Sequence, residues 1–136
     1  MDDLSKSLRI SAAGMRAQGT RLRIITENLA NADSTAVSPD GEPYRRKTVS
    51  FRNTLDRSLG AQTVQVNKVS EDTSPFVRKY DPGNPAADAS GYVQTANVNP
   101  LIEMADMREA QRTYEANINV IKAAKTMLQQ TIDVLR

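Results

Sequence analysis

The sequence contains no cysteine, histidine or tryptophan, and aromatic residues make up only 4% of its 136 residues. The missing cysteines exclude disulfides and thiolate chemistry, and without histidine the commonest zinc ligands and general bases are lacking. No glycine-rich phosphate loop, nucleophile elbow or dinucleotide-binding motif occurs either. The sequence therefore predicts no enzyme activity, with no catalytic residue, no cofactor and no metal site.

Long apolar runs and a strong charge imbalance are also missing. No apolar stretch is long enough to cross a bilayer, which predicts no direct membrane insertion. The first residues, MDDLSKSLRISAAGM, lack the continuous apolar core of a cleaved secretory signal. The formal net charge is +2 and basic residues are interspersed with acidic ones, so no nucleic-acid partner is expected.

One group of acidic residues needs an explanation. Asp81 and Asp88, with Glu71 and Asp72 upstream, resemble a carboxylate site for calcium or glycoside chemistry. They lie beside prolines and glycines, where aspartate normally stabilises turns, and the EF-hand pattern is absent. The turn interpretation is therefore preferred.

The last third of the chain, residues 99–136, has the pattern of one long amphipathic helix. After Pro100, which suits a first helical turn, no proline or glycine interrupts it, so the helix would be roughly 50 Å long. A compact domain of this size cannot bury such a helix, so a partner helix is needed. The apolar stripe comprises Met104, Met107, Tyr114, Ile118, Ile121, Leu128, Ile132 and Leu135, with Ala110 and Ala124 on the same side. The face predicted to be solvated or to meet a partner comprises Glu103, Asp106, Arg108, Glu109, Arg112, Lys122 and Lys125.

The partner helix is predicted at the other end of the chain, from about Asp3 to Ala30. Its seam alternates steps of four and three over about four heptads, which is coiled-coil spacing. Gly14 and Gly19 lie off the seam and suggest close approach of another backbone or a weak point. Two separate amphipathic helices on a core are the alternative, but an antiparallel pair of the two termini is preferred. The seam comprises Leu4, Leu8, Ser11, Met15, Gln18, Leu22, Ile25 and Leu29.

Two asparagines lie where the first helix should end. Asn31 is predicted as a left-handed C-terminal cap. Asn28, in the last turn, bonds either to the backbone or to a neighbouring subunit. A satisfied helix terminus is the preferred interpretation of both residues.

Residues 33–96 have few helix signals. A loop over 33–43 contains the turn Pro39-Asp40-Gly41, and short strands are predicted at 44–51, 63–69, 76–80 and 91–95. The basic triplet Arg45-Arg46-Lys47 either binds an acidic partner or a phosphate, or is a solvated strand edge. The predicted fold is mainly α with a small β-rich insertion, and its long N- and C-terminal helices form an antiparallel coiled-coil-like pair. The predicted domains are a terminal helical domain, 1–32 with 97–136, and a β-rich loop insertion, 33–96.

Several short motifs are spread over nearly the whole chain. A general set comprises Ala13-Gly14-Met15, Arg21-Leu22 and Asn28-Leu29-Ala30-Asn31. A narrower set comprises Pro39-Asp40-Gly41-Glu42-Pro43-Tyr44-Arg45-Arg46-Lys47, Ser74-Pro75-Phe76, Tyr80-Asp81-Pro82-Gly83-Asn84-Pro85, Gly91-Tyr92-Val93, Asn97-Val98-Asn99-Pro100 and residues 109–117. The general set resembles the flagellar axial proteins, and the narrower set resembles, within that family, the proximal rod proteins.

The resemblance implies a structural subunit of the bacterial flagellar rod, which transmits torque across the periplasm and forms part of the export channel wall. It implies export by the type III apparatus without signal cleavage, and assembly with FlgB, FlgF, FlgG, FliE and copies of itself in a helical lattice. A soluble helical adaptor or export chaperone is the alternative. The predicted assembly interface comprises Leu4, Leu8, Met15, Leu22, Ile25, Leu29, Asn28, Asn31, Tyr114, Ile118, Ile121, Leu128, Ile132 and Leu135.

Overall fold

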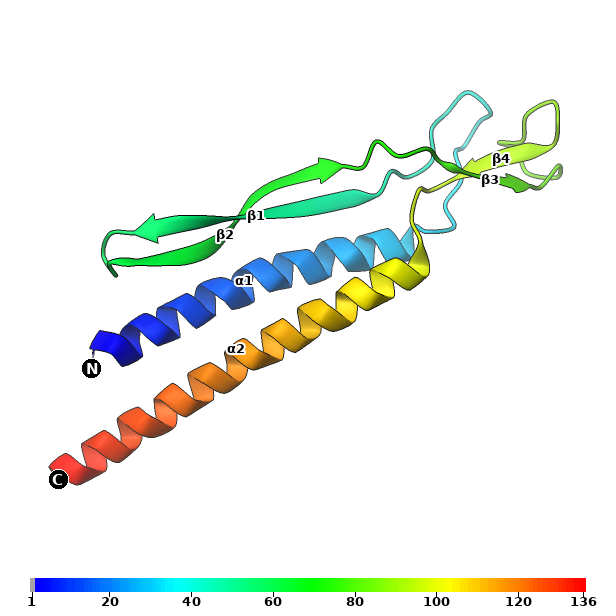
Figure 1. The fold of residues 1–136 in the computed structure, drawn as a ribbon. Coiled ribbons are helices and arrows are strands. Elements are labelled where there is room, and N and C mark those ends of the chain that lie inside the picture. Colours follow the sequence, from blue (N-terminus) through cyan, green and yellow to red (C-terminus); the bar gives the residue numbers. More distant parts are fainter. Residues whose placement is uncertain (1) are drawn as a thin grey trace. The chain divides into compact units, whose positions relative to one another are not determined.

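The computed structural model describes residues 2–136, which form two helices and four strands (Figure 1). β1 pairs with β2 and β3 pairs with β4, giving two small antiparallel sheets. In chain order the elements are α1 (Asp2–Ala30), β1 (Lys47–Asp56), β2 (Ala61–Glu71), β3 (Val77–Tyr80), β4 (Tyr92–Thr95) and α2 (Pro100–Leu135).

The prediction of a mainly α fold is wrong. Helix accounts for 48% of the described residues and strand for 22%, so the β-rich middle is a substantial part of the protein. The error lies mostly in β1 and β2, which are 10 and 11 residues long. The strands predicted from the sequence, at 44–51 and 63–69, are shorter than β1 and β2. Many of their residues are exposed and polar, as in Arg52-Asn53, so no apolar alternation indicated their full length. Gly60, at φ +62°, lies just before β2 begins.

The described residues form two compact units. The first contains the chain up to Leu22, Ser50–Lys68 and Arg108–Arg136, and the second contains Arg23–Val49 and Val69–Met107. Both helices and the β1–β2 hairpin contribute residues to each unit.

In the first unit, α1 and α2 run antiparallel. A Cβ on Gly14 would lie 2.8 Å from Nδ2 of Asn117, and Nη2 of Arg21 lies 3.6 Å from Oε2 of Glu109. Rising numbers on α1 therefore meet falling numbers on α2. The close approach suggested for Gly14 is to a side chain rather than to a backbone, whereas Gly19 has no such atom within 4 Å.

The other side of α1 in the first unit faces the β1–β2 hairpin. Leu59 and Thr63 of the hairpin are buried, as are Ala13 and Ala17 of α1. These alanines have little side-chain volume, so they fill little of the space between the helix and the hairpin.

The second unit contains the small β3–β4 sheet, in which Val77 pairs with Thr95 and Tyr80 with Tyr92. Its apolar core includes Val93 and Ala96, each 1% exposed. Gly91 precedes β4 at φ +83°, and a Cβ there would lie 2.9 Å from the Tyr80 ring. This position therefore requires glycine both for its backbone conformation and for space.

The end of α1, in the second unit, differs from its prediction. No residue other than glycine has a positive φ between positions 2 and 136, so the predicted left-handed cap at Asn31 is wrong. Instead, the Asn31 side chain donates its Nδ2–H to the carbonyl of Glu27 at 2.8 Å. The same carbonyl also accepts the Asn31 backbone N–H at 3.2 Å. The next two carbonyls, of Asn28 and Leu29, accept the backbone N–H groups of Asn31 and Ala32 at 3.2 and 3.3 Å, so no left-handed residue is needed.

Candidate functional site

A cluster of charged and polar side chains lies at the centre of the second unit. Glu103, in the first turn of α2, is 1% exposed, and it accepts hydrogen bonds from the Nε–H of Arg46 and, at 3.4 Å, from Nδ2 of Asn28. Nη1 of Arg46 also lies 3.3 Å from Oδ2 of Asp72. We call Asn28, Arg46, Asp72 and Glu103 the polar cluster. A buried carboxylate of this kind is stable only when it is paired and hydrogen-bonded.

The electrostatics of the polar cluster favour its charged forms. Burial lowers the pKa of Arg46, but the hydrogen bonds and charges of Glu103 and Asp72 outweigh burial and raise that pKa above its ordinary value. The pKa of Asp72 is lowered, first by the hydrogen bond from the Ser74 hydroxyl and then by the Ser74 backbone N–H and Arg46. Arg46 and Asp72 are therefore both ionised at neutral pH.

Asn28 connects the end of α1 to the start of β1. Its Oδ1 accepts hydrogen bonds from the Lys47 backbone N–H at 2.9 Å and the Tyr44 hydroxyl at 2.8 Å. Its Nδ2 donates to the Lys47 carbonyl at 2.8 Å. Burial is the largest cause of the raised pKa of Tyr44, which keeps this hydroxyl a hydrogen-bond donor. Asn28 is therefore fully engaged by its own chain.

Asn97 makes a similar connection ahead of α2. Its Oδ1 accepts a hydrogen bond from the Arg46 backbone N–H at 2.7 Å. Its Nδ2 donates to the carbonyls of Asp72 and Ser74, both at 3.0 Å. Asn28 and Asn97 therefore hold the backbone around Arg46 in place, so that its side chain can reach Glu103.

The basic triplet binds acids and carbonyls of its own chain. Arg45 lies over the Phe76 ring, 4.2 Å from its centroid, and donates to the Asp72 carbonyl at 3.0 Å. Nζ of Lys47 lies 3.1 Å from Oε2 of Glu27. With Arg46 in the polar cluster, all three side chains have partners within the second unit.

The sequence interpretation misplaced Glu103, which it assigned to the solvated face of α2. The residue is buried because Arg46 and Asn28 supply the partners that a carboxylate needs. A signal was available, since Glu103, Ala110, Asn117 and Ala124 recur every seven residues on the inward side of the helix. Glu103 was assigned to the solvated face because it is charged, although its position in the heptad pattern is an inward one.

The predicted assembly residues differ widely in exposure. Ile25 and Asn28 are buried, whereas Ile132 and Leu135 are exposed, 47% and 81% respectively. The rest are half-buried, so the chain's own contacts cover part of each side chain. These half-buried residues are Leu4, Leu8, Met15, Leu22, Leu29, Asn31, Tyr114, Ile118, Ile121 and Leu128.

Further apolar side chains on α2 were not part of the predicted interface. In the first unit, Met127 is 54% and Val134 85% exposed, and both line a shallow apolar groove with Leu4 and Leu135. In the second unit, the first turns of α2 expose Leu101, Ile102 and Met104. Exposed apolar side chains grouped along one helix are typical of a protein–protein interaction surface.

The carboxylates suspected as a site act in turns. Oδ1 of Asp88 accepts hydrogen bonds from the backbone N–H groups of Ser90 and Tyr92 at 2.9 and 3.0 Å. No group of three or more potential metal ligands occurs within residues 2–136. Over the same range, neither helix has the length and apolarity needed to cross a membrane.

Comparison with known proteins first identifies a class of flagellar proteins that the C-terminal part of the chain resembles. Residues 89–134 match the family described as flagellar basal body rod FlgEFG protein C-terminal. Curated relatives extend the similarity to nearly the whole chain. The flagellar basal-body rod protein FlgC of Agrobacterium fabrum is 52% identical, with 100% of this chain and 98% of the relative aligned.

Two further FlgC proteins are less similar in sequence. FlgC of Bacillus subtilis is 41% identical, covering 94% of this chain and 95% of its own length. FlgC of Salmonella typhimurium is 43% identical, with coverages of 90% and 91%. The chain therefore belongs to the FlgC family of flagellar basal-body rod proteins.

Proposed function

We propose that the protein is a structural subunit of the bacterial flagellar basal-body rod. The observation that carries this proposal is the similarity to FlgC proteins along nearly the full length of both chains. The relatives are named as rod proteins, and no enzymatic activity is proposed for this chain. Its place is the flagellar basal body, where it associates with other rod proteins.

The finer proposal is a role in the proximal rod. The subunit transmits torque across the periplasm, forms part of the export channel wall and contacts FlgB, FlgF, FlgG, FliE and its own copies. It reaches this place by export without a cleaved signal peptide. The apolar residues left uncovered on α2 support the proposal, because heterologous contacts that do not close generate tubes and filaments.

Within this proposal, residues 1–32 and 97–136 form the assembling helical part and 33–96 the β-rich insertion. The predicted interface residues act at subunit contacts to the extent that each is exposed. Ile132 and Leu135 are therefore the best candidates, because both are exposed on α2.

The test replaces Ile132 with aspartate in a strain that lacks the native gene. Ile132→Asp should abolish incorporation into basal bodies and motility, since burying one isoleucine at an interface contributes about 1.5–3 kcal/mol. Gln129→Asp, at an exposed polar position of the same helix, is the matched control and should assemble normally. The measurement is an immunoblot of purified basal bodies together with swimming in soft agar.

The localisation of the unmodified protein separates the proposal from its alternative. A rod subunit co-purifies with intact basal bodies. A soluble helical adaptor or export chaperone would remain in the cytosolic fraction, and this result would reject the rod proposal.

A further inference from the structure

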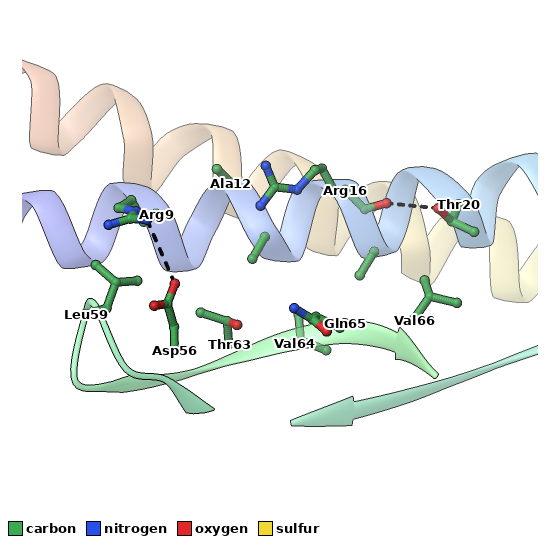
Figure 2. Close-up of a pocket in the computed structure, with 12 residues that line it drawn as sticks. Arg9, Ala12, Arg16, Thr20, Asp56, Leu59, Thr63, Val64, Gln65 and Val66 are labelled. Carbon is green, nitrogen blue, oxygen red and sulfur yellow. Dashed lines mark hydrogen bonds and ion pairs between the residues drawn. The ribbon is translucent and has the colours of Figure 1, made fainter. Parts of the chain in front are cut away.

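The first unit contains an open groove between α1 and the β1–β2 hairpin, with a volume of about 390 Å³ (Figure 2). Ala12, Ala13 and Ala17 of α1 line one side of it, and Leu59 and Val64 of the hairpin line the other. The groove exists because small side chains on the helix leave space below the hairpin that no side chain of this unit fills. We call it the alanine groove.

The alanine groove also has a basic character. Arg9 and Arg16 both line it, and Oδ2 of Asp56 lies 3.9 Å from Nη2 of Arg9. Arg16 is exposed, and its guanidinium has no ion-pair partner among the residues that the structure describes. The groove therefore combines an apolar surface with one uncompensated positive charge, which suits an occupant that is apolar and acidic.

The loop over residues 33–43, in the second unit, has this complementary chemistry. It contains Asp33, Asp40 and Glu42 and no basic residue. At its middle, Val37 is 95% exposed, which is the largest exposure among the large apolar residues described. Glu42 has a distant partner, with its Oε1 3.9 Å from Nη2 of Arg45, whereas Asp33 and Asp40 are exposed.

We propose that the alanine groove of one copy binds the 33–43 loop of a second copy, with Val37 against the alanines and Asp40 towards Arg16. The inference rests on the proposed function, because it names a contact between subunits of the rod. Groove and loop are different surfaces, so the contact is heterologous, and its repetition adds copies without limit unless a ring closes.

The C-terminal turns of α2 are the other candidate occupant from a second copy. They expose Val134 and Leu135, but Asp133 is their one acid and Arg136 offsets its charge. The loop, with three acids and no base, matches the uncompensated Arg16 better. Charge complementarity therefore selects the loop.

Cross-linking tests the contact directly, because the chain has no cysteine of its own. One copy carries Val37→Cys with an affinity tag, and a co-expressed untagged copy carries Gln65→Cys, at an exposed position that lines the groove. Mild oxidation of purified basal bodies should give a mixed dimer on a non-reducing gel. Asn119→Cys, on an exposed position of α2 outside the groove, replaces Gln65→Cys in the control and should give none. The pair Ser38→Cys and Thr20→Cys repeats the test at neighbouring positions.

Charge exchange gives a second measure. Arg16→Glu should lower the yield of mixed dimer about two- to fivefold, as expected for one exposed ion pair. Adding Asp40→Arg should restore the yield. Basal bodies that contain both cysteine variants but give no mixed dimer with either cysteine pair would overturn the inference and leave the proposed function intact. Basal bodies that lack the unmodified protein would reject the proposed function itself.

Discussion

The two units of the molecule are stabilised by different chemistry. At the centre of the second unit, Glu103 is 1% exposed and bonded to Arg46 and Asn28. In the first unit, the most buried residues of the helices are small, as in Ala17 and Ala110, which are 3% and 0% exposed. One unit thus has a charged centre with many specific partners, and the helices of the other bury mainly alanines.

The small buried residues of the first unit leave its larger apolar side chains for a neighbour. Burial of apolar area stabilises a protein by about 25 cal/mol per Å², and an alanine buries little area. Larger side chains of the first unit, such as Met127 and Val134, remain uncovered. The first unit therefore has apolar surface available for assembly. A hydrogen-bonded ion pair has only a few acceptable geometries, so we infer that the polar cluster sets the positions of the chain segments in the second unit.

The units also differ in how well their polar atoms are satisfied. In the polar cluster, the side-chain oxygen and the side-chain nitrogen of Asn28 both have partners. In the first unit, Oε1 of Gln18 is buried and has no hydrogen-bond partner among the described residues. Replacing a buried polar side chain by an apolar one should therefore lower the free energy of unfolding in the polar cluster and raise it at Gln18.

The largest effect is expected at the polar cluster. Glu103→Ala leaves the guanidinium of Arg46 without its principal acceptor, and should lower the free energy of unfolding by about 3–5 kcal/mol. Urea denaturation of the purified protein, followed by circular dichroism, measures this change. The matched control is Glu109→Ala on the same helix, where the carboxylate is 69% exposed and pairs with Arg21. That change should cost about 0.2–1 kcal/mol, and equal costs at the two positions would contradict the contrast between the units.

In the first unit, Gln18→Leu should be stabilising. The substitution removes a buried oxygen that lacks a donor and keeps a side chain of similar length, so the free energy of unfolding should rise by about 1–3 kcal/mol. Gln111→Leu, at an exposed position of α2, is the control and should change stability by less than about 0.5 kcal/mol. A destabilising Gln18→Leu would mean that this oxygen has a partner, such as a bound water.

The sequence predicted the two helices well because their signals are local. The apolar steps of three and four begin and end close to the observed limits of α1 and α2, and Pro100 opens α2 as expected. The β1–β2 hairpin was underestimated, since one of its faces is solvated and polar. The cap at Asn31 was wrong because backbone N–H groups of Asn31 and Ala32 bond to the last carbonyls of α1 without a left-handed residue.

The polar cluster could not be predicted from local patterns. Arg46 and Glu103 are 57 residues apart in the chain, and no spacing rule links them. A carboxylate at an inward heptad position indicates that a buried ion pair exists. Which cation completes the pair can be identified only from the fold. The predicted interface residues depend on partner chains, so their roles stay predictions.

The smallest effect concerns two similar turns, Asp72-Thr73-Ser74 in the second unit and Asp56-Arg57-Ser58 in the first. In each, the serine hydroxyl donates to Oδ1 of the aspartate, at 2.5 and 2.6 Å respectively, and is the largest cause of the lowered aspartate pKa. An aspartate with a lowered pKa stabilises the fold above its unfolded pKa of about 3.9, and this contribution is lost as the pH falls through the folded pKa.

Ser74→Ala should therefore raise the pKa of Asp72 and move acid unfolding to higher pH, because the Asp72 carboxylate also lies 3.3 Å from Arg46 in the polar cluster. Ser58→Ala is the matched change and should raise the pKa of Asp56 with a smaller effect on unfolding, since its cation, Arg9, is 3.9 Å away and 58% exposed. Carboxyl-carbon NMR titration gives each pKa, and circular dichroism from pH 7 to pH 2 follows unfolding. If Ser58→Ala shifted acid unfolding as far as Ser74→Ala, the stability at low pH would not depend on the polar cluster.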